Sequence, residues 1–348
     1  MSIRLGNTDR ALRRAWHPVA RSTEVGTEPV SIRLLGEDWV LVRLPDPDAP
    51  DGTRLAAFVD VCPHRLAPLS AGTVVGNGLR CGYHGWCFDA DGHCVDIPAL
   101  GGERIPSRAD LLAPAALTEH QGLVFLAPEP PLTDLLHVSE ADDPTFVDGT
   151  LPPTRARVGA GLMIDNFLDM AHFPFVHAGT IGSEDAIDVP DFEIERTGYG
   201  MRVHSRHWFP NHEDPAVERG ERDLLQERIL TYEYRAPFLA SLRIDYVQAG
   251  GTNVVTLFVQ PEDDEHSRLY ATIHRDDLGD EPARMPGMVA YEGKILEEDL
   301  VIQERYRDRR LPLDLTDEVH IKADRSTIEL RRILADLVAE VAAFTAPA

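Results

Sequence analysis

Short runs of apolar residues, separated by turn signals, fill the first third of the chain. The clearest runs, rich in Val, Ile, Leu and Phe, are residues 31–35, 39–44, 55–59 and 123–126. Clusters of Gly, Asn, Asp and Pro separate them, as at residues 76–78 and 89–92. Short strands at this spacing predict a small antiparallel sandwich or barrel.

The pattern changes after a Pro-rich and acidic stretch at residues 127–143. Residues 161–171 repeat apolar side chains at helical spacing, and residues 192–275 return to strand-like patterning. Two further helices are expected, at about 287–309 and about 317–343. Helices therefore come from both ends of the second region, on either side of its strands.

These patterns predict an α+β protein with two domains. The first is an all-β domain at residues 1–127, with its core at about 16–127. The second, at residues 128–348, is an antiparallel sheet covered by helices. A length of 348 residues fits two domains, and 43% hydrophobic with 26% charged residues fits a globular protein with a sizeable core.

Charge and hydropathy exclude several classes of partner. With 34 Lys+Arg against 58 Asp+Glu, the formal net charge is −24. Phosphate backbones and anionic membrane surfaces would be repelled, so we expect neither nucleic acid nor membrane as a partner. No run approaches the roughly 18 apolar residues of a membrane span, and the N-terminal residues contain no signal-like apolar run. The sequence predicts a cytoplasmic protein.

All four cysteines lie between residues 62 and 94, which favours a metal site over a disulfide scaffold. Two short segments each offer one thiolate and one imidazole: Cys62 with His64, and Cys81 with His84. Such donors suit zinc or an iron–sulfur centre. A mixed Cys/His pair in each loop favours a two-iron cluster with two cysteines on one iron and two histidines on the other.

The remaining cysteines, Cys87 and Cys94, are expected to be core residues of the hairpin that follows the second loop. A ligand role for either is not expected.

A second constellation lies in the apolar stretch of residues 165–177. Asp169 and His172 are three residues apart, so they project from the same face of a helix. His172 and His177 differ by about 140° on a continuous helix, so they could share a metal only if Pro174 ends or kinks it. Without the upstream Cys/His segments and Asp169, two such histidines would more often be hydrogen-bonded core residues.

Two imidazoles and one carboxylate form a facial triad that binds Fe(II) and leaves positions open for dioxygen. In the predicted helix near residue 300, Asp299 lies on the apolar face with Ile295 and Leu296. A carboxylate facing the core is costly unless it is paired or metal-bound. Asp299 is therefore the expected ligand, and Glu298, four residues from Lys294 on a solvated face, is the alternative.

The segments CPHRLAPLSAG and RCGYHGWCFD resemble the C-x-H…C-x-x-H motif of the Rieske-type oxygenases. The resemblance implies a [2Fe–2S] cluster with Cys62 and Cys81 on the inner iron and His64 and His84 on the outer one. The chain is closest to the branch of vanillate O-demethylase, phthalate oxygenase and dicamba demethylase.

The second motif of that family, N-x-x-D-x-x-H-x-x-x-x-H with a distant Asp, is matched by this chain. Asn166 lies near the iron by this resemblance, and His172, His177 and Asp299 hold a mononuclear Fe(II). The resemblance implies that Asp169 bridges one of these histidines to a cluster histidine, His84, of a neighbouring subunit. It also implies a head-to-tail homotrimer and a helix-grip catalytic domain.

The family's function follows as an expectation. The chain would be the terminal oxygenase of a system in which a separate reductase or ferredoxin supplies electrons. With O2 as co-substrate, it would hydroxylate, or oxidatively O- or N-demethylate, a small aromatic or cyclic compound. A cis-dihydroxylating dioxygenase is the alternative enzyme, and a Rieske electron carrier is the alternative of another class. No GxGxxG fingerprint opens a helix, so NAD(P)H and flavin are expected only on the partner reductase.

The substrate pocket is expected between the iron helix and the sheet of residues 200–275. Arg243 or Arg206 would be the cation for a substrate carboxylate. The possible lining residues are His204, Arg206, His207, Tyr232, Tyr234, Arg243 and Tyr246. Strand alternation turns about half of such residues outward.

Overall fold

The computed structural model describes residues 3–183, 187–212, 214–278 and 282–345. The chain divides into two compact units, Arg13–Leu132 and Met1–Leu12 with Thr133–Ala348. The first twelve residues belong with the C-terminal unit, where β1 (Arg4–Leu5) pairs with β20 (Leu311–Pro312). The domain boundary at residue 127 stays a prediction.

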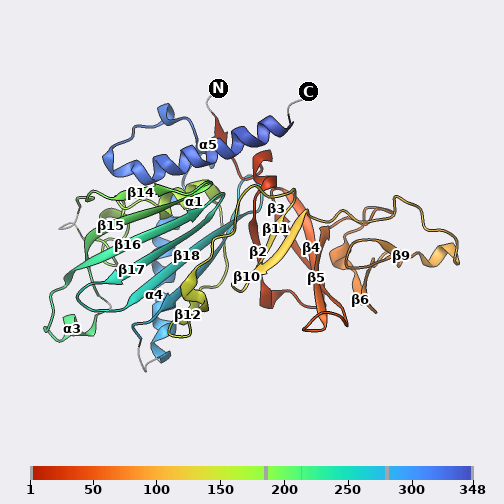
Figure 1. Ribbon diagram of the computed structural model, residues 1–348, viewed down its shortest axis with the longest axis horizontal. Helices are drawn as coiled ribbons and strands as arrows, with labels where there is room; N and C mark the ends of the chain where they lie inside the picture. Colours follow the sequence, from red (N-terminus) through yellow and green to blue (C-terminus); the bar gives the residue numbers. More distant parts are fainter. Residues whose placement is uncertain (1–2, 184–186, 213, 279–281, 346–348) are drawn as a thin grey trace. The chain divides into compact units, whose positions relative to one another are not determined.

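The unit Arg13–Leu132 is built from short antiparallel strands, which confirms the expected all-β domain (Figure 1). Its three sheets contain β10 (Ala116–His120), β11 (Leu123–Ala127) and β2 (His17–Arg21); β3 (Val30–Leu34), β4 (Glu37–Pro45) and β5 (Thr53–Val59); and β6 (Thr73–Val75), β7 (Gly78–Arg80), β8 (Cys87–Phe88) and β9 (Cys94–Asp96).

The C-terminal unit contains one large antiparallel sheet. Its neighbouring strands run in the order β12 (Val147–Thr150), β19 (Ser267–Arg275), β18 (Thr252–Pro261), β17 (Leu239–Tyr246), β16 (Leu225–Arg235), β15 (Gly200–Pro210) and β14 (Glu193–Arg196), and β13 (Thr154–Ala156) also pairs with β19. Buried and more exposed residues alternate along β15 and β16, because one face of each strand is covered.

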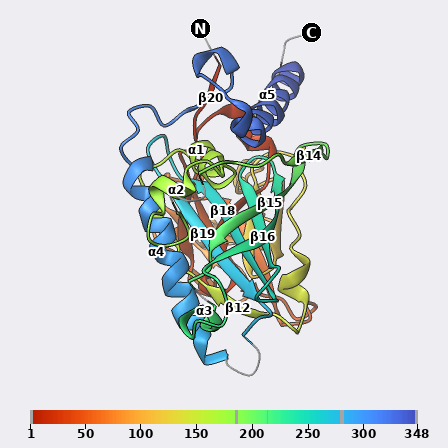
Figure 2. The same cartoon turned by 90° about the vertical axis from the view of Figure 1, so that its left-hand side faces the viewer.

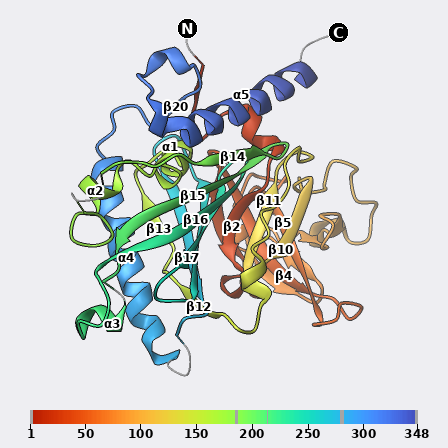
Figure 3. The same ribbon diagram turned by 60° about the vertical axis from the view of Figure 1, so that its left-hand side comes forward.

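Helices cover this sheet, as the sequence predicts. The α-helices are α1 (Ala160–Phe167), α2 (Phe173–Val176), α3 (Pro215–Glu218), α4 (Met285–Gln303) and α5 (Arg325–Thr345). Short 3-10 turns are η1 (Arg10–Arg14), η2 (Ser22–Glu24), η3 (Leu69–Ala71), η4 (Pro98–Leu100), η5 (Ser139–Asp142), η7 (Pro282–Arg284), η8 (Leu315–Asp317) and η9 (Lys322–Asp324). Helix α4 runs along one face of the sheet (Figure 2), α1 packs on β17 and β18, and α5 lies beside β14 (Figure 3).

The helix expected at residues 161–171 is shorter than predicted. Helix α1 ends at Phe167, and the carbonyl of Leu168 accepts a hydrogen bond from Ser326 Oγ at 2.9 Å. Asp169 Oδ1 then accepts the Ala171 N–H at 2.8 Å, a local turn that competes with helix. The break therefore lies before Pro174, which occupies the first turn of α2.

No helix within the described ranges is both long enough and apolar enough to cross a membrane.

Candidate metal centres

The two Cys/His segments form matching loops. Cys62 follows β5, and Cys81 lies between β7 and β8. In each loop the fourth residue after the cysteine, Leu66 or Gly85, has a positive φ, of 58° and 76°. Its N–H donates to the cysteine carbonyl, at 2.9 Å for Leu66 and 3.1 Å for Gly85. In the second loop a Cβ on Gly82 would lie 2.6 Å from the carbonyl oxygen of Ala71, so only glycine fits there.

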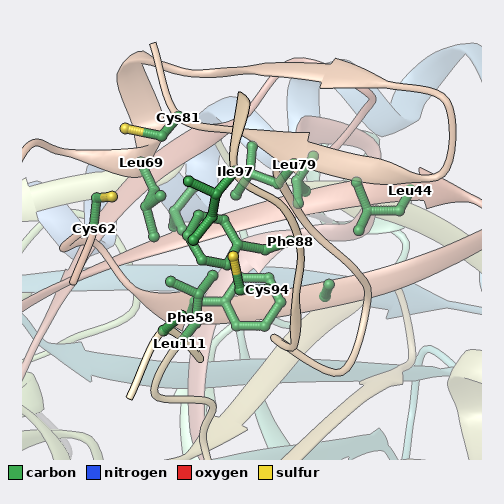
Figure 4. Packing of buried hydrophobic residues seen from close by; sticks show 14 residues of the cluster. Leu44, Phe58, Cys62, Leu69, Leu79, Cys81, Phe88, Cys94, Ile97 and Leu111 are labelled. Carbon is green, nitrogen blue, oxygen red and sulfur yellow. The ribbon is translucent and has the colours of Figure 1, made fainter. Parts of the chain in front are cut away.

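Inside these loops the thiols are buried and the imidazoles lie nearer the surface. Cys62 and Cys81 are each 2% exposed. They lie at one edge of the apolar cluster of this unit, which includes Phe58, Leu69 and Phe88 (Figure 4). Burial raises the pKa of Cys62 to about 11, and the neighbouring Cys81 contributes to the increase. The rings of His64 and His84 are 4.4 Å apart, and the buried Nδ1 of His64 has no hydrogen-bond partner among the described residues.

Those donors fit a Rieske cluster. Binding to a metal would strongly stabilise the two buried thiols as thiolates. The buried Nδ1 of His64, which has no hydrogen-bond partner among the described residues, is free to act as a metal ligand. Cys87 and Cys94 are free and buried in β8 and β9, as expected for hairpin core residues, and Cys94 packs near Phe58 and Phe88 (Figure 4).

The second centre brings His172, His177 and Asp299 together. One ligand atom from each lies within 4.8 Å of the others. The Nε2 atoms of His172 and His177 are 3.2 Å apart, and both approach Asp299 Oδ1, at 3.4 Å and 3.2 Å. His177 is 1% exposed, and Asn166 Nδ2 donates to Asp299 Oδ1 at 3.1 Å.

Carboxylates behind the two imidazoles set their tautomers. Asp169 Oδ2 lies 3.3 Å from Nδ1 of His172, and Glu298 Oε2 lies 2.9 Å from Nδ1 of His177. Because a carboxylate accepts, each Nδ1 carries the hydrogen, and each Nε2 presents a lone pair toward Asp299. Two lone pairs and a carboxylate that converge on one point require a cation, so this donor set fits Fe(II).

The pKa values of the site reflect the same need for positive charge. Burial acts to lower the pKa of His172, but the carboxylates of Asp169 and Asp299 raise it to about 9. For Asp299, burial acts to raise the pKa, but the contacts with the imidazoles of His172 and His177 lower it to about 2.

Glu298 differs from its expected position on a solvated face. Its side chain is 22% exposed and turns toward His177, where Thr180 Oγ1 also donates to Glu298 Oε2 at 2.9 Å. Lys294 is a distant partner at 3.9 Å. The helical spacing of Glu298 and Lys294 therefore does not predict the contact between Glu298 and His177, which are distant in sequence.

A largely apolar cavity opens beside this centre, between α1, α2, α4 and the sheet. Besides His172, His177 and Asp299, its wall includes Met163, Phe167, Phe209, Leu230, Leu242, Ile244, Val255, Ile273, Leu296, Arg228, Arg275, Tyr246 and Asn253. A second, more polar cavity also borders His172 and Asp299, and its wall includes Asp169, Gln303, His320 and Arg331.

The sequence identified few of the cavity's sheet residues. Among the seven expected lining residues, only Tyr246 lies in its wall. Arg206 and Arg243 point from the other face of their strands, where Arg206 pairs with Glu227 and Arg243 with Asp245. The remaining residues are engaged elsewhere: His204 contacts Thr231, His207 contacts the carbonyls of Trp208 and Asp188, Tyr234 donates to the carbonyl of Pro237, and Tyr232 is buried under Phe167.

This fold and these two centres define an iron-dependent oxygenase with its own electron-carrier cluster. Residues 15–109 match the Rieske [2Fe-2S] domain, and residues 157–340, more than half of the chain, match the vanillate O-demethylase oxygenase C-terminal domain. The chain belongs to the family of Rieske-type oxygenases and is an oxygenase component.

Curated relatives cover most of the chain. Methylxanthine N1-demethylase NdmA from Pseudomonas putida is 28% identical over 94% of this chain and 89% of its own length. The vanillate O-demethylase oxygenase subunit of a Pseudomonas species is 25% identical over 94% of this chain and 95% of its own length. The structure of NdmA with caffeine superposes with a TM-score of 0.80 at 27% identity, covering 96% of this chain and 93% of that one.

Proposed function

We propose that this oxygenase hydroxylates or oxidatively demethylates a small aromatic or cyclic compound, with His172, His177 and Asp299 as ligands of a mononuclear iron. The convergence of three acceptor atoms within 4.8 Å, at the wall of an apolar cavity, carries the proposal. Cys62, His64, Cys81 and His84 would hold the Rieske cluster. Once bound, the cluster supplies one-electron transfer and the ferrous ion supplies activation of dioxygen.

The surrounding residues prepare this site in distinct ways. Asn166 fixes one oxygen of Asp299, and Glu298 with Thr180 fixes the ring of His177. Apolar residues of α1, α4 and the sheet exclude water from the cavity and orient the substrate beside the histidines. For a methyl ether, the overall reaction is R–OCH3 + O2 + 2 H⁺ + 2 e⁻ → R–OH + HCHO + H2O.

Asp169 is proposed as the positioning residue through which electrons arrive. Its carboxylate contacts His172, its side chain is 29% exposed, and it lines the polar cavity but not the apolar one. A neighbouring subunit of a head-to-tail trimer would present its His84 there. Electrons would come from a separate reductase or ferredoxin that binds NAD(P)H and flavin.

A substrate panel tests the reaction type. The iron-loaded protein is chemically reduced and exposed to O2 with methyl ethers, N-methyl heterocycles, aromatic acids and plain arenes, and mass spectrometry identifies the products. A gain of one oxygen, or loss of methyl with release of formaldehyde, supports the proposal. Addition of two oxygens and two hydrogens would assign cis-dihydroxylation instead, and cluster oxidation without any product would favour an electron carrier.

A further inference from the structure

One cation in the wall of the substrate cavity has no acidic partner. Arg228, in β16, is 5% exposed, and none of the carboxylates in the described ranges lies within 4.0 Å of its guanidinium. Its Nη2 donates to the carbonyl of Pro210 at 3.0 Å, and its buried Nε has no hydrogen-bond partner among the described residues. A buried charge in this state is costly, because the one neutral acceptor replaces only part of its hydration.

Aromatic rings fix the guanidinium in place. Its carbon lies 5.0 Å from the ring centre of Tyr246 and 5.7 Å from that of Phe209. Such cation–π contacts orient the group but do not neutralise its charge. The other arginine of the cavity wall, Arg275, differs in this respect, because Asp277 binds it through two oxygens at 2.9 Å and 2.7 Å.

The position of Arg228 relates it to the reacting end of the pocket. Phe209, which stacks near Arg228, lies 5.6 Å from the ring of Phe173, and Phe173 lies 4.8 Å from that of His172. Arg228 and His172 therefore border the same cavity, and a chain of ring contacts through Phe209 and Phe173 connects them. A substrate that reaches both would place one substituent on Arg228 and another beside the histidines.

We infer that Arg228 binds the carboxylate of the substrate, so that the preferred substrates are aromatic or cyclic carboxylic acids that react at the end of the ring remote from the acid group. The inference rests on the proposed function for the reaction itself. A carboxylate accepts paired N–H donors in the plane of a guanidinium, and it would supply the charge that this buried site lacks.

The test compares a matched pair of probes, 4-methoxybenzoate and the neutral 4-methoxybenzamide, by calorimetry on the iron-loaded protein. We expect the acid to bind about 10- to 100-fold more tightly than the amide, the range for a charge-assisted hydrogen bond. Arg228→Gln removes that preference and leaves amide binding within about twofold, and Arg228→Lys retains part of it. Arg206→Gln, a paired cation on the outer face of the sheet, leaves both affinities unchanged.

Equal binding of acid and amide to the wild type, no binding of the acid, or an Arg228→Gln variant that keeps the preference would each overturn the inference. The comparison in the wild type needs no variant, so misfolding of Arg228→Gln does not affect it. Binding also needs no turnover. A tightly bound acid that yields no product contradicts the proposed function alone, whereas turnover of a ligand bound without charge preference contradicts only the role of Arg228.

Discussion

At the scale of single residues, the proposed iron site has two adjacent carboxylates of α4 in different positions. Asp299 Oδ1 faces both Nε2 atoms, whereas Glu298 lies behind His177 and holds its Nδ1 hydrogen. Consecutive residues on a helix differ by about 100° in direction, so one turn of helix places both around the same imidazole pair.

This geometry predicts different losses for the two carboxylates. Asp299→Asn should remove tight iron binding, whereas Glu298→Gln should weaken iron binding or activity about 10- to 100-fold, as is typical when a carboxylate behind a ligating histidine is lost. Glu297→Gln, exposed on the same helix, is the matched control. Iron content per chain after dialysis distinguishes them. Retention of iron in Asp299→Asn with its loss in Glu298→Gln would exchange the assigned roles.

The proposed cluster ligands have an equally direct test. Cys81→Ser should abolish the visible absorption of the Rieske cluster, because one of two buried thiolates is lost. Cys87→Ser changes a buried cysteine of β8, the strand that follows the Cys81 loop, and the absorption should persist in that variant. Equal loss of colour in both variants would mean that folding of the sheet, and not ligation, explains the effect.

At the scale of elements, an ion pair joins the C-terminal half of α1 to α5. Arg331 of α5 is 3% exposed and contacts Asp165 of α1 as well as Glu318, so it neutralises a partly buried carboxylate beside the segment of the proposed iron ligands. Burial raises the pKa of Asp165, which shows the cost that Arg331 must offset.

Removal of that cation should destabilise the fold. Arg331→Met leaves Asp165 without its charge partner, and the free energy of unfolding should fall by about 3–5 kcal/mol. Arg332→Met, at an exposed neighbouring position with a side chain 58% exposed, should change it by less than about 0.5 kcal/mol. Urea denaturation measures both. A small, equal effect in the two variants would contradict the role given to the Asp165–Arg331 pair.

The elements also show what sequence can and cannot predict here. Short apolar runs and the turn residues between them located β3, β4, β5 and β11 to within a few residues, because local burial determines that pattern. The end of α1 was missed, because the acceptor of its last turn is satisfied by Ser326, distant in sequence. Arg228 lies on the same face of β16 as Leu230 and Tyr232, but strand alternation does not say which face lines a cavity.

Candidate ligands were more predictable than pocket residues. Cys62, His64, Cys81, His84, His172, His177 and Asp299 are chemically unusual residues at defined spacings, and the structure brings the last three together. Arg206 and Arg243 were expected in the pocket for their charge alone, and each is neutralised elsewhere by a carboxylate. The position of an ordinary residue type depends on the register of the whole sheet.

At the scale of the whole molecule, the proposed trimer can be tested by complementation. A His172→Ala chain should keep a working cluster but no iron site, and a Cys81→Ser chain the reverse. Co-expressed and purified together through two tags, the mixed oligomer should regain turnover, because the cluster of one subunit would serve the iron of the next through Asp169. Sedimentation should give the mass of three chains. Inactive mixtures in which each variant retains its other metal would contradict transfer between subunits.

The most direct test of the account is a single turnover with ¹⁸O2, after full reduction of the cluster and loading with iron and a substrate from the panel. We expect cluster oxidation to accompany one product per active site, with ¹⁸O in the hydroxylated product or in the released formaldehyde. His172→Ala should keep the Rieske spectrum and form no product. Equal product from His172→Ala, or product without loss of cluster electrons, would contradict the assignment of the two centres.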